Sequence, residues 1–243
     1  MPKYTIRPIA LCQGPRDLSH YTYTMNQGVK CISGCYIWYI EGAPKRILVD
    51  TGATAAMITA RGVEETDIIS TADGLKRLGL TPDDIEIVVA THLHFDHIGL
   101  GYLYKNARFI VQKKELDYAL NPHPIDATSY DRSQFENLKF EVIDGEKEIV
   151  PDLTVFLTPG HTPGGQSVAV NTTAGTAIIT GFCGNLRTFE QTEAMKRRGW
   201  EVAIPLLHHD TEQMYDSVLA VKRRADIILP LHESAFIGRD RIP

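Results

Sequence analysis

The sequence predicts a layered α/β fold in which one domain spans residues 1–243. Short apolar runs alternate with helical patterns along the chain, which is typical of strands packed against helices. Of the 243 residues, 43% are hydrophobic, which is enough for one substantial core. No stretch has linker composition and no fixed period repeats, so we expect a single domain.

The first half of the chain predicts four strands and two helices. The strands are expected over residues 35–40, 46–50, 85–90 and 108–112. A turn-rich stretch, Glu-Gly-Ala-Pro, joins the first two of them. A helix is expected to begin at a Ser70 or Thr71 cap and to end at Gly79. The stretch Lys-Lys-Glu-Leu-Asp-Tyr-Ala-Leu predicts a short helix directly after the fourth strand.

The second half repeats this alternation. Strands are expected over residues 153–158, 166–170, 176–180 and 226–230. Asp210, with Gln213 three residues later, is typical of a helix cap, and apolar residues fall on one face of the helix that follows. The polar stretch 121–145 suits an excursion over a pocket better than a core element.

Charge and composition argue against several classes of protein. The net charge is −5 and the pI is near 6.0, which does not suggest a nucleic-acid-binding or membrane-surface protein. The basic triplets 196–198 and 222–224 are interpreted as solvated helix faces or ends. No run approaches the ~20 apolar residues of a membrane span, and no signal peptide is evident, so we expect a cytoplasmic protein. Irregular spacing argues against a disulfide framework, and Cys12, Cys31 and Cys35 are expected to be small buried apolar side chains.

Potential metal ligands, or groups that orient them, follow the ends of five strand-like runs. These residues are Asp50; the group His92, His94, Asp96 and His97; His161; Cys183; and His232. Strand ends of a layered sheet can converge on one edge, where ligands commonly bind. The sequence therefore predicts a metal site assembled at a sheet edge.

The spacing of these residues divides them between two ions. His92 and His94 are two apart in extended backbone and project to the same side. With His161 they form the expected ligands of one ion. Asp96 and His97 follow as the chain turns, and with His232 they are candidates for a second ion. A single histidine after a strand is usually a surface residue, but a cluster of three imidazoles and a carboxylate has little structural benefit without a metal.

The motifs together resemble the metallo-β-lactamase superfamily. The matching stretches are residues 48–52, 91–99, 159–167, 178–185 and 229–233, in the order of that family. The resemblance implies a four-layer αβ/βα sandwich of two mixed sheets with outer helices and metals at one edge. It implies that Asp50 orients a metal-bound histidine. Length and local pattern are most similar to N-acyl homoserine lactonases and related small hydrolases.

One departure from the family pattern concerns the residue that bridges the metals. Dinuclear members carry Thr-Gly-Asp, but here Phe182 stands in the place of the aspartate and Cys183 follows it. Cys183 is a candidate thiolate ligand; the alternatives are a buried thiol, or metals held by the histidines and Asp96 alone. The tyrosine that lactonases carry shortly afterwards is also missing, and Asn185 and Leu186 stand there.

These features predict a hydrolase that uses a metal-bound hydroxide to open a lactone or cleave a carboxylic ester. Asp96 is expected to hold the second ion and orient the hydroxide. The expected cofactors are two divalent ions, with zinc favoured and manganese, iron or cobalt as alternatives. Alternative functions are thioester, amide or β-lactam hydrolysis, a mononuclear iron enzyme that oxidises thiols, a nuclease, and a metal-binding protein without catalysis.

The sequence indicates the substrate-binding residues less clearly than the metal ligands. His123, Phe182 and His208 are candidate substrate-binding residues, each with a surface or packing role as the alternative. Trp38, Trp200 and the stretch 121–145 suit either a pocket wall or a contact in a homodimer. The expected partner is a small molecule, with no nucleic acid and no membrane.

Overall fold

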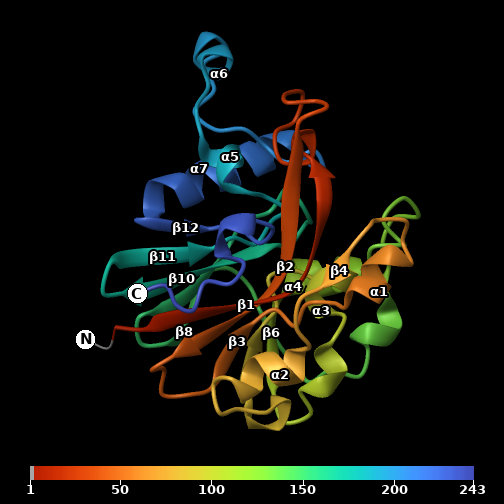
Figure 1. Ribbon diagram of the computed structural model, residues 1–243, viewed down its shortest axis with the longest axis vertical. Helices are drawn as coiled ribbons and strands as arrows, with labels where there is room; N and C mark the ends of the chain where they lie inside the picture. The colour runs from red at the N-terminus through yellow and green to blue at the C-terminus, as the bar shows by residue number, and fades with distance from the viewer. Residues whose placement is uncertain (1–2) are drawn as a thin grey trace.

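Two mixed sheets pack face to face in the computed structural model, which describes residues 3–243 (Figure 1). The first two residues of the predicted 1–243 domain therefore lie outside the described residues. The seven-stranded sheet has the order β4-β1-β2-β3-β5-β6-β7. Its strands are β1 (Thr5–Asp17), β2 (Lys30–Glu41), β3 (Ile47–Val49), β4 (Thr66–Asp67), β5 (Ile87–Val89), β6 (Arg108–Gln112) and β7 (Phe140–Ile143). Strands β3, β5, β6 and β7 are parallel, whereas β1 pairs antiparallel with β2 and β4.

The five-stranded sheet has the order β12-β11-β10-β9-β8. Its strands are β8 (Lys147–Val150), β9 (Leu153–Leu157), β10 (Gln166–Thr172), β11 (Gly175–Ile179) and β12 (Ile227–Leu229). Only the β11–β12 pair is parallel, so β9, β11 and β12 all run in one direction. Three strands of this sheet therefore end at the same edge.

The helices lie outside the two sheets. They are α1 (Ala55–Thr59), α2 (Thr71–Lys76), α3 (Phe95–Ile98), α4 (Lys113–Leu120), α5 (Leu186–Phe189), α6 (Glu193–Arg197) and α7 (Thr211–Arg224). Leu75 of α2 packs on the outer face of the first sheet, and Met214 and Val218 of α7 pack on the outer face of the second. The predicted sandwich of two mixed sheets with outer helices is confirmed. Among residues 3–243, no helix is long and apolar enough to cross a membrane.

The apolar runs are buried because each central strand has a covered surface on both sides. In β5, Ile87 and Val89 face the core between the sheets, while Val88 faces the helical layer. Consecutive apolar residues are expected in strands buried on both faces. Trp38 is fully buried in the core between the sheets, so neither sequence interpretation of it, as a pocket wall or a dimer contact, is correct.

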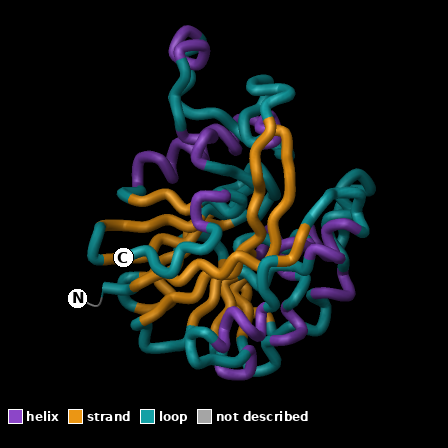
Figure 2. The backbone as a smooth tube through the Cα atoms, in the orientation of Figure 1, coloured by secondary structure: helices purple, strands orange, loops and turns teal. Residues whose placement is uncertain are grey.

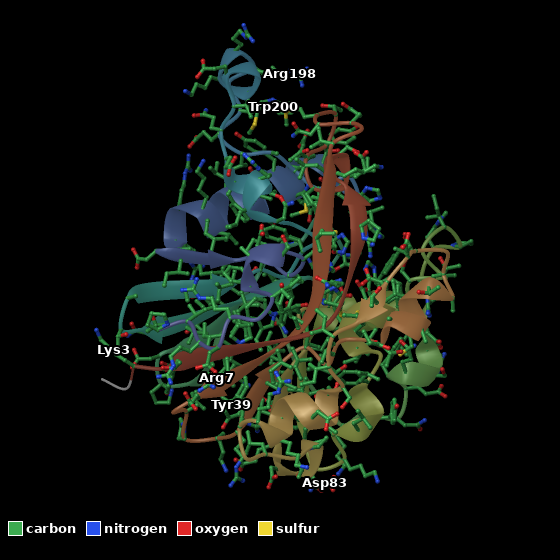
Figure 3. The ribbon with its side chains drawn as sticks, viewed as in Figure 1. Lys3, Arg7, Tyr39, Asp83, Arg198 and Trp200 are labelled. Carbon is green, nitrogen blue, oxygen red and sulfur yellow. The ribbon has the colours of Figure 1, made fainter. Side chains whose placement is uncertain are left out.

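Two segments extend beyond the sandwich. Figure 2 shows β1 and β2 as a long hairpin that extends beyond the ends of the other strands. Figure 3 places Arg198 and Trp200 at the tip of the segment that carries α6, and the Arg198 guanidinium lies 5.2 Å from the centre of the Trp200 ring. The stretch 121–145 is divided: residues near 125 border a cavity, whereas residues 140–143 form edge strand β7, so the predicted excursion is correct only for its first part.

Candidate metal centre

The first three histidines converge although they come from both sheets. His92 and His94 follow β5 of the first sheet, and His161 follows β9 of the second. One ring nitrogen from each lies within 4.8 Å of the other two. The ring centres of His92 and His94 each lie 4.9 Å from that of His161. We call these three residues the first cluster.

Hydrogen bonds fix the rings of the first cluster. His161 Nδ1 donates to the Leu207 carbonyl at 2.7 Å, and His92 Nδ1 lies 3.0 Å from Thr91 Oγ1. Among the described residues, Nε2 of His92 and Nε2 of His94 are buried without a hydrogen-bond partner. A buried polar atom without a partner is costly, and an ion between these nitrogens would satisfy both of them.

The second cluster consists of Asp96, His97 and His232, whose ligand atoms also lie within 4.8 Å of one another. Asp96 Oδ2 lies 3.4 Å from His97 Nε2 and 3.8 Å from His232 Nε2. His232 Nδ1 donates to the Gly34 carbonyl at 3.1 Å, which leaves its Nε2 facing the cluster. Asp96 and His97 lie on the short helix α3, whose cap is His94, so one turn of chain connects the clusters.

Asp50 is fully buried next to the second cluster. Its Oδ2 accepts a hydrogen bond from His97 Nδ1 at 2.8 Å, and its Oδ1 accepts one from the Thr91 backbone at 2.8 Å. Its φ of 58° is left-handed, a conformation that aspartate tolerates better than most residues. The carboxylate therefore directs Nε2 of His97 toward Asp96.

His97 differs in protonation from the other four histidines of the two clusters. Burial lowers the pKa of His92 and His94 well below the usual value, and it lowers the pKa of His161 and His232 to about 4. These four imidazoles are therefore neutral at pH 7, as metal ligands must be. Burial also acts on His97, but Asp96 and Asp50 outweigh it and raise the His97 pKa well above the usual value. Burial opposes ionisation of Asp96, yet His97 and His232 hold the pKa of that carboxyl well below its usual range.

The donor sets suit metal ions. Each cluster offers three protein ligands, which is the number that catalytic zinc sites use while keeping a position open. Imidazole nitrogen and carboxylate oxygen are both common zinc ligands. The residues present therefore fit two divalent ions.

A cavity of about 1090 Å³ lies over both clusters. His94, Asp96, His97, His161 and His232 line it, whereas His92 is fully buried and is not part of the lining. Three exposed apolar side chains also line it: Ile125 (80% exposed), Leu206 (41%) and Leu207 (55%). The cavity thus combines polar, ligand-type side chains with apolar positions open to solvent.

The candidate substrate-binding residues have different positions. His123 and His208 both line the cavity. Phe182 does not: it is fully buried and packs with Phe189 and Val202 beneath the helices of the second sheet. The chain bends at residues 181–183, after β11 has ended, and there Phe182 turns into the outer apolar layer while Cys183 lines the cavity. The structure therefore corrects the expectation that Phe182 contacts substrate.

A match to a known family covers most of the chain, since residues 33–232 match the metallo-beta-lactamase superfamily. The chain belongs to this superfamily. The resemblance drawn from the motifs is therefore confirmed, and the strand-end residues occupy the edge at which members of the superfamily are expected to hold metals.

Relatives within the superfamily are N-acyl homoserine lactonases. One from Bacillus sp is 28% identical over 96% of this chain and 91% of its own length. One from Bacillus thuringiensis is 28% identical over 85% of this chain and 80% of its own. Among solved structures, a quorum-quenching N-acyl homoserine lactone lactonase has a TM-score of 0.75 at 25% identity, over 97% of this chain and 95% of that one. An N-acyl homoserine lactone hydrolase with N-hexanoyl-L-homoserine at its catalytic metal centre has a TM-score of 0.73 at 25% identity, over 98% and 95%.

Cys183 lines the cavity but belongs to neither cluster of this superfamily member. It packs with Leu18 and Tyr21, and burial raises the pKa of its thiol to about 12, with Asp96 adding to the effect. In this arrangement Cys183 is a protonated thiol beside the second cluster. Its role as a metal ligand stays a prediction.

Several cavity residues were not predicted from the sequence. Arg16 and Tyr21 reach the cavity from the β1–β2 hairpin, and Arg61 follows α1. His209 Nε2 lies 3.0 Å from Asp126 Oδ2, a contact that joins two loops of the cavity wall. No sequence motif indicates that these residues line the cavity, because tertiary packing brings each of them there. Only His209 adjoins a predicted residue, His208, in the chain.

Proposed function

We propose that the chain is a metal-dependent hydrolase that opens the ring of N-acyl homoserine lactones. The observation that carries the proposal is the pair of three-ligand clusters under a cavity that also has exposed apolar side chains. The lactonase relatives, similar over nearly the whole chain, support the same substrate class.

Under this proposal His92, His94 and His161 hold one ion, and Asp96, His97 and His232 hold the other. Zinc is the favoured metal because the donors are three imidazoles in the first cluster and two imidazoles with one carboxylate in the second. Bound ions of this kind polarise a carbonyl group and lower the pKa of a bound water toward about 7.

The chain's own residues then orient and bind the reactants. Leu207 O and Gly34 O fix the rings of His161 and His232 through their Nδ1 atoms, and Asp50 does so for His97. Asp96 stays ionised, so its carboxylate can accept a hydrogen bond from the attacking water and align it. Ile125, Leu206 and Leu207 provide apolar surface that suits the acyl chain of the substrate.

The experiment is a substrate panel with the purified chain: N-acyl homoserine lactones of increasing acyl length, a simple γ-lactone, an aryl ester, a thioester and a β-lactam. Acid release is followed at constant pH. We expect the highest kcat/KM for an acylated lactone, loss of activity with a chelator, and recovery with zinc. Turnover of only the ester, thioester or β-lactam would contradict the lactone assignment; a single iron with thiol-dependent oxygen uptake would contradict hydrolysis itself.

The Cys183→Ala variant tests whether Cys183 is a metal ligand or whether the histidines and Asp96 hold the metals alone. Because Cys183 lies outside both clusters, we expect two metal ions per chain in the variant, as in the unchanged protein. Elemental analysis after exhaustive dialysis measures this number. A fall to about one ion would instead make the thiolate a ligand of the second ion. The cytoplasmic location and the homodimer stay predictions.

A further inference from the structure

A buried carboxylate lies behind the first cluster and is not one of its ligands. Glu115, in the first turn of α4, is fully buried and accepts four hydrogen bonds. Its Oε1 accepts from the Leu93 backbone N–H at 2.9 Å and from the Tyr130 hydroxyl at 3.2 Å. Its Oε2 accepts from Thr162 Oγ1 at 2.7 Å and from the Gly164 backbone N–H at 3.2 Å. One side chain therefore connects three separate loops.

Each of these loops carries or contacts a histidine of the first cluster. Leu93 stands between His92 and His94 in the chain, and Thr162 directly follows His161. The ring of Tyr130 meets the ring of His94 edge to face, with 4.7 Å between the ring centres. The Glu115 carboxylate therefore binds a chain neighbour of each of the three histidines, Leu93 or Thr162, although the histidines come from two different sheets.

The loop after His161 is packed closely against α4. A Cβ placed on Gly164 would lie 2.1 Å from the Glu115 backbone nitrogen, so the loop after His161 touches α4 directly. Burial raises the pKa of Glu115, and the four hydrogen bonds oppose that shift. A buried carboxylate is costly, and an apolar side chain could fill the same space without that cost. Holding the loops in register is a role that an apolar side chain could not take.

We propose that Glu115 is a positioning residue for the metal ion of the first cluster. It sets the spacing between the His92–His94 loop and the His161 loop through its four hydrogen bonds. Groups that hydrogen-bond directly to metal ligands and orient them raise metal affinity. Glu115 acts one contact farther out, on residues that adjoin the ligands. The inference rests on the metal centre of the proposed function, but not on the lactone substrate.

The test is the metal affinity of Glu115→Gln, measured by titrating zinc into the metal-free chain in competition with a chromophoric chelator. The amide keeps the shape of the side chain but turns an NH₂ group toward either the Leu93 or the Gly164 backbone N–H. The hydroxyls of Tyr130 and Thr162 can rotate to accept a hydrogen bond, but a backbone N–H cannot. We expect affinity for one of the two ions to fall by roughly tenfold to a hundredfold, with the other unchanged.

Asp117→Asn is the matched control, because Asp117 lies on the same helix, is exposed, and pairs with Lys113 alone among residues 3–243. It is expected to bind both ions with the affinity of the unchanged chain. Thr162→Val is a second test that leaves Glu115 in place and removes the shortest of its four hydrogen bonds. It is expected to weaken the same ion severalfold, so a Glu115→Gln chain that fails to fold does not end the test.

The outcomes separate the hypotheses. If Glu115 only stabilises the fold, Glu115→Gln will melt at a lower temperature but bind both ions as the unchanged chain does, and the inference is wrong. Unchanged affinity in Thr162→Val, with Glu115→Gln unfolded, also overturns it. If the unchanged chain binds no metal, the proposed function fails and this inference fails with it. If both ions bind but lactones are not hydrolysed, only the substrate assignment fails.

Discussion

Replacing His94 by alanine is expected to remove one metal ion per chain and to lower kcat/KM for lactone hydrolysis by about a thousandfold. The variant leaves the first cluster with two imidazoles, His92 and His161, which is fewer ligands than catalytic zinc sites use. An ion that stabilises the transition state by several kcal/mol is then lost. Elemental analysis and initial rates measure the two effects.

The fold should tolerate this change, because His94 lines an open cavity and its removal leaves no sealed void. His123→Ala is the matched control: it removes an exposed histidine from the same cavity wall but outside both clusters. It is expected to keep two ions. A His94→Ala chain that keeps two ions and its full rate would show that the first cluster is not the metal site.

The two three-residue groups predicted from the sequence are the groups that the structure brings together. The prediction was possible because His92 and His94 are close in the chain and follow a recognisable buried strand, Ile87–Val89. His161 and His232 also follow apolar strands, and strands β9, β11 and β12 run toward one edge. The pattern of apolar runs therefore locates the strand ends and the edge of the sheet at which these histidines lie.

The parts that could not be predicted depend on contacts distant in sequence. Strand β1 contains Pro8 and Pro15, which argue against a strand, yet it pairs with β2 along most of its length. Its hairpin brings Arg16 and Tyr21 to the cavity, and no local motif indicates that.

A shift of one residue explains the error at Phe182. The sequence aligned Phe182 with the aspartate of related enzymes and placed it near substrate, but the side chain joins the outer apolar layer instead. Because the chain bends at residues 181–183, the side chain that lines the cavity is that of Cys183, one position after the residue aligned with the aspartate. Periodicity fixes the strand itself, but it does not fix the facing of residues in the turn after it.

Replacing Asp96 by asparagine should separate a dinuclear enzyme from a mononuclear one. Asp96 supplies the only carboxylate of the two clusters, and its Oδ2 lies within 4 Å of Nε2 in both His97 and His232. The amide has the same shape but is a weaker ligand without charge. We expect one ion per chain instead of two and a kcat lower by about a thousandfold, since the variant also loses the group that aligns the attacking water.

Asp126→Asn is the control for this change, because it removes a carboxylate of the same cavity wall that belongs to neither cluster. It is expected to bind two ions. An Asp96→Asn chain that binds one ion yet hydrolyses lactones at the full rate would mean that the first cluster is sufficient for the reaction. Asp96, His97 and His232 would then be a dispensable site, and a mononuclear mechanism would replace the one proposed. If the variant binds one ion and hydrolyses lactones slowly, and if neither zinc nor manganese restores the rate, the reaction requires the Asp96 carboxylate itself.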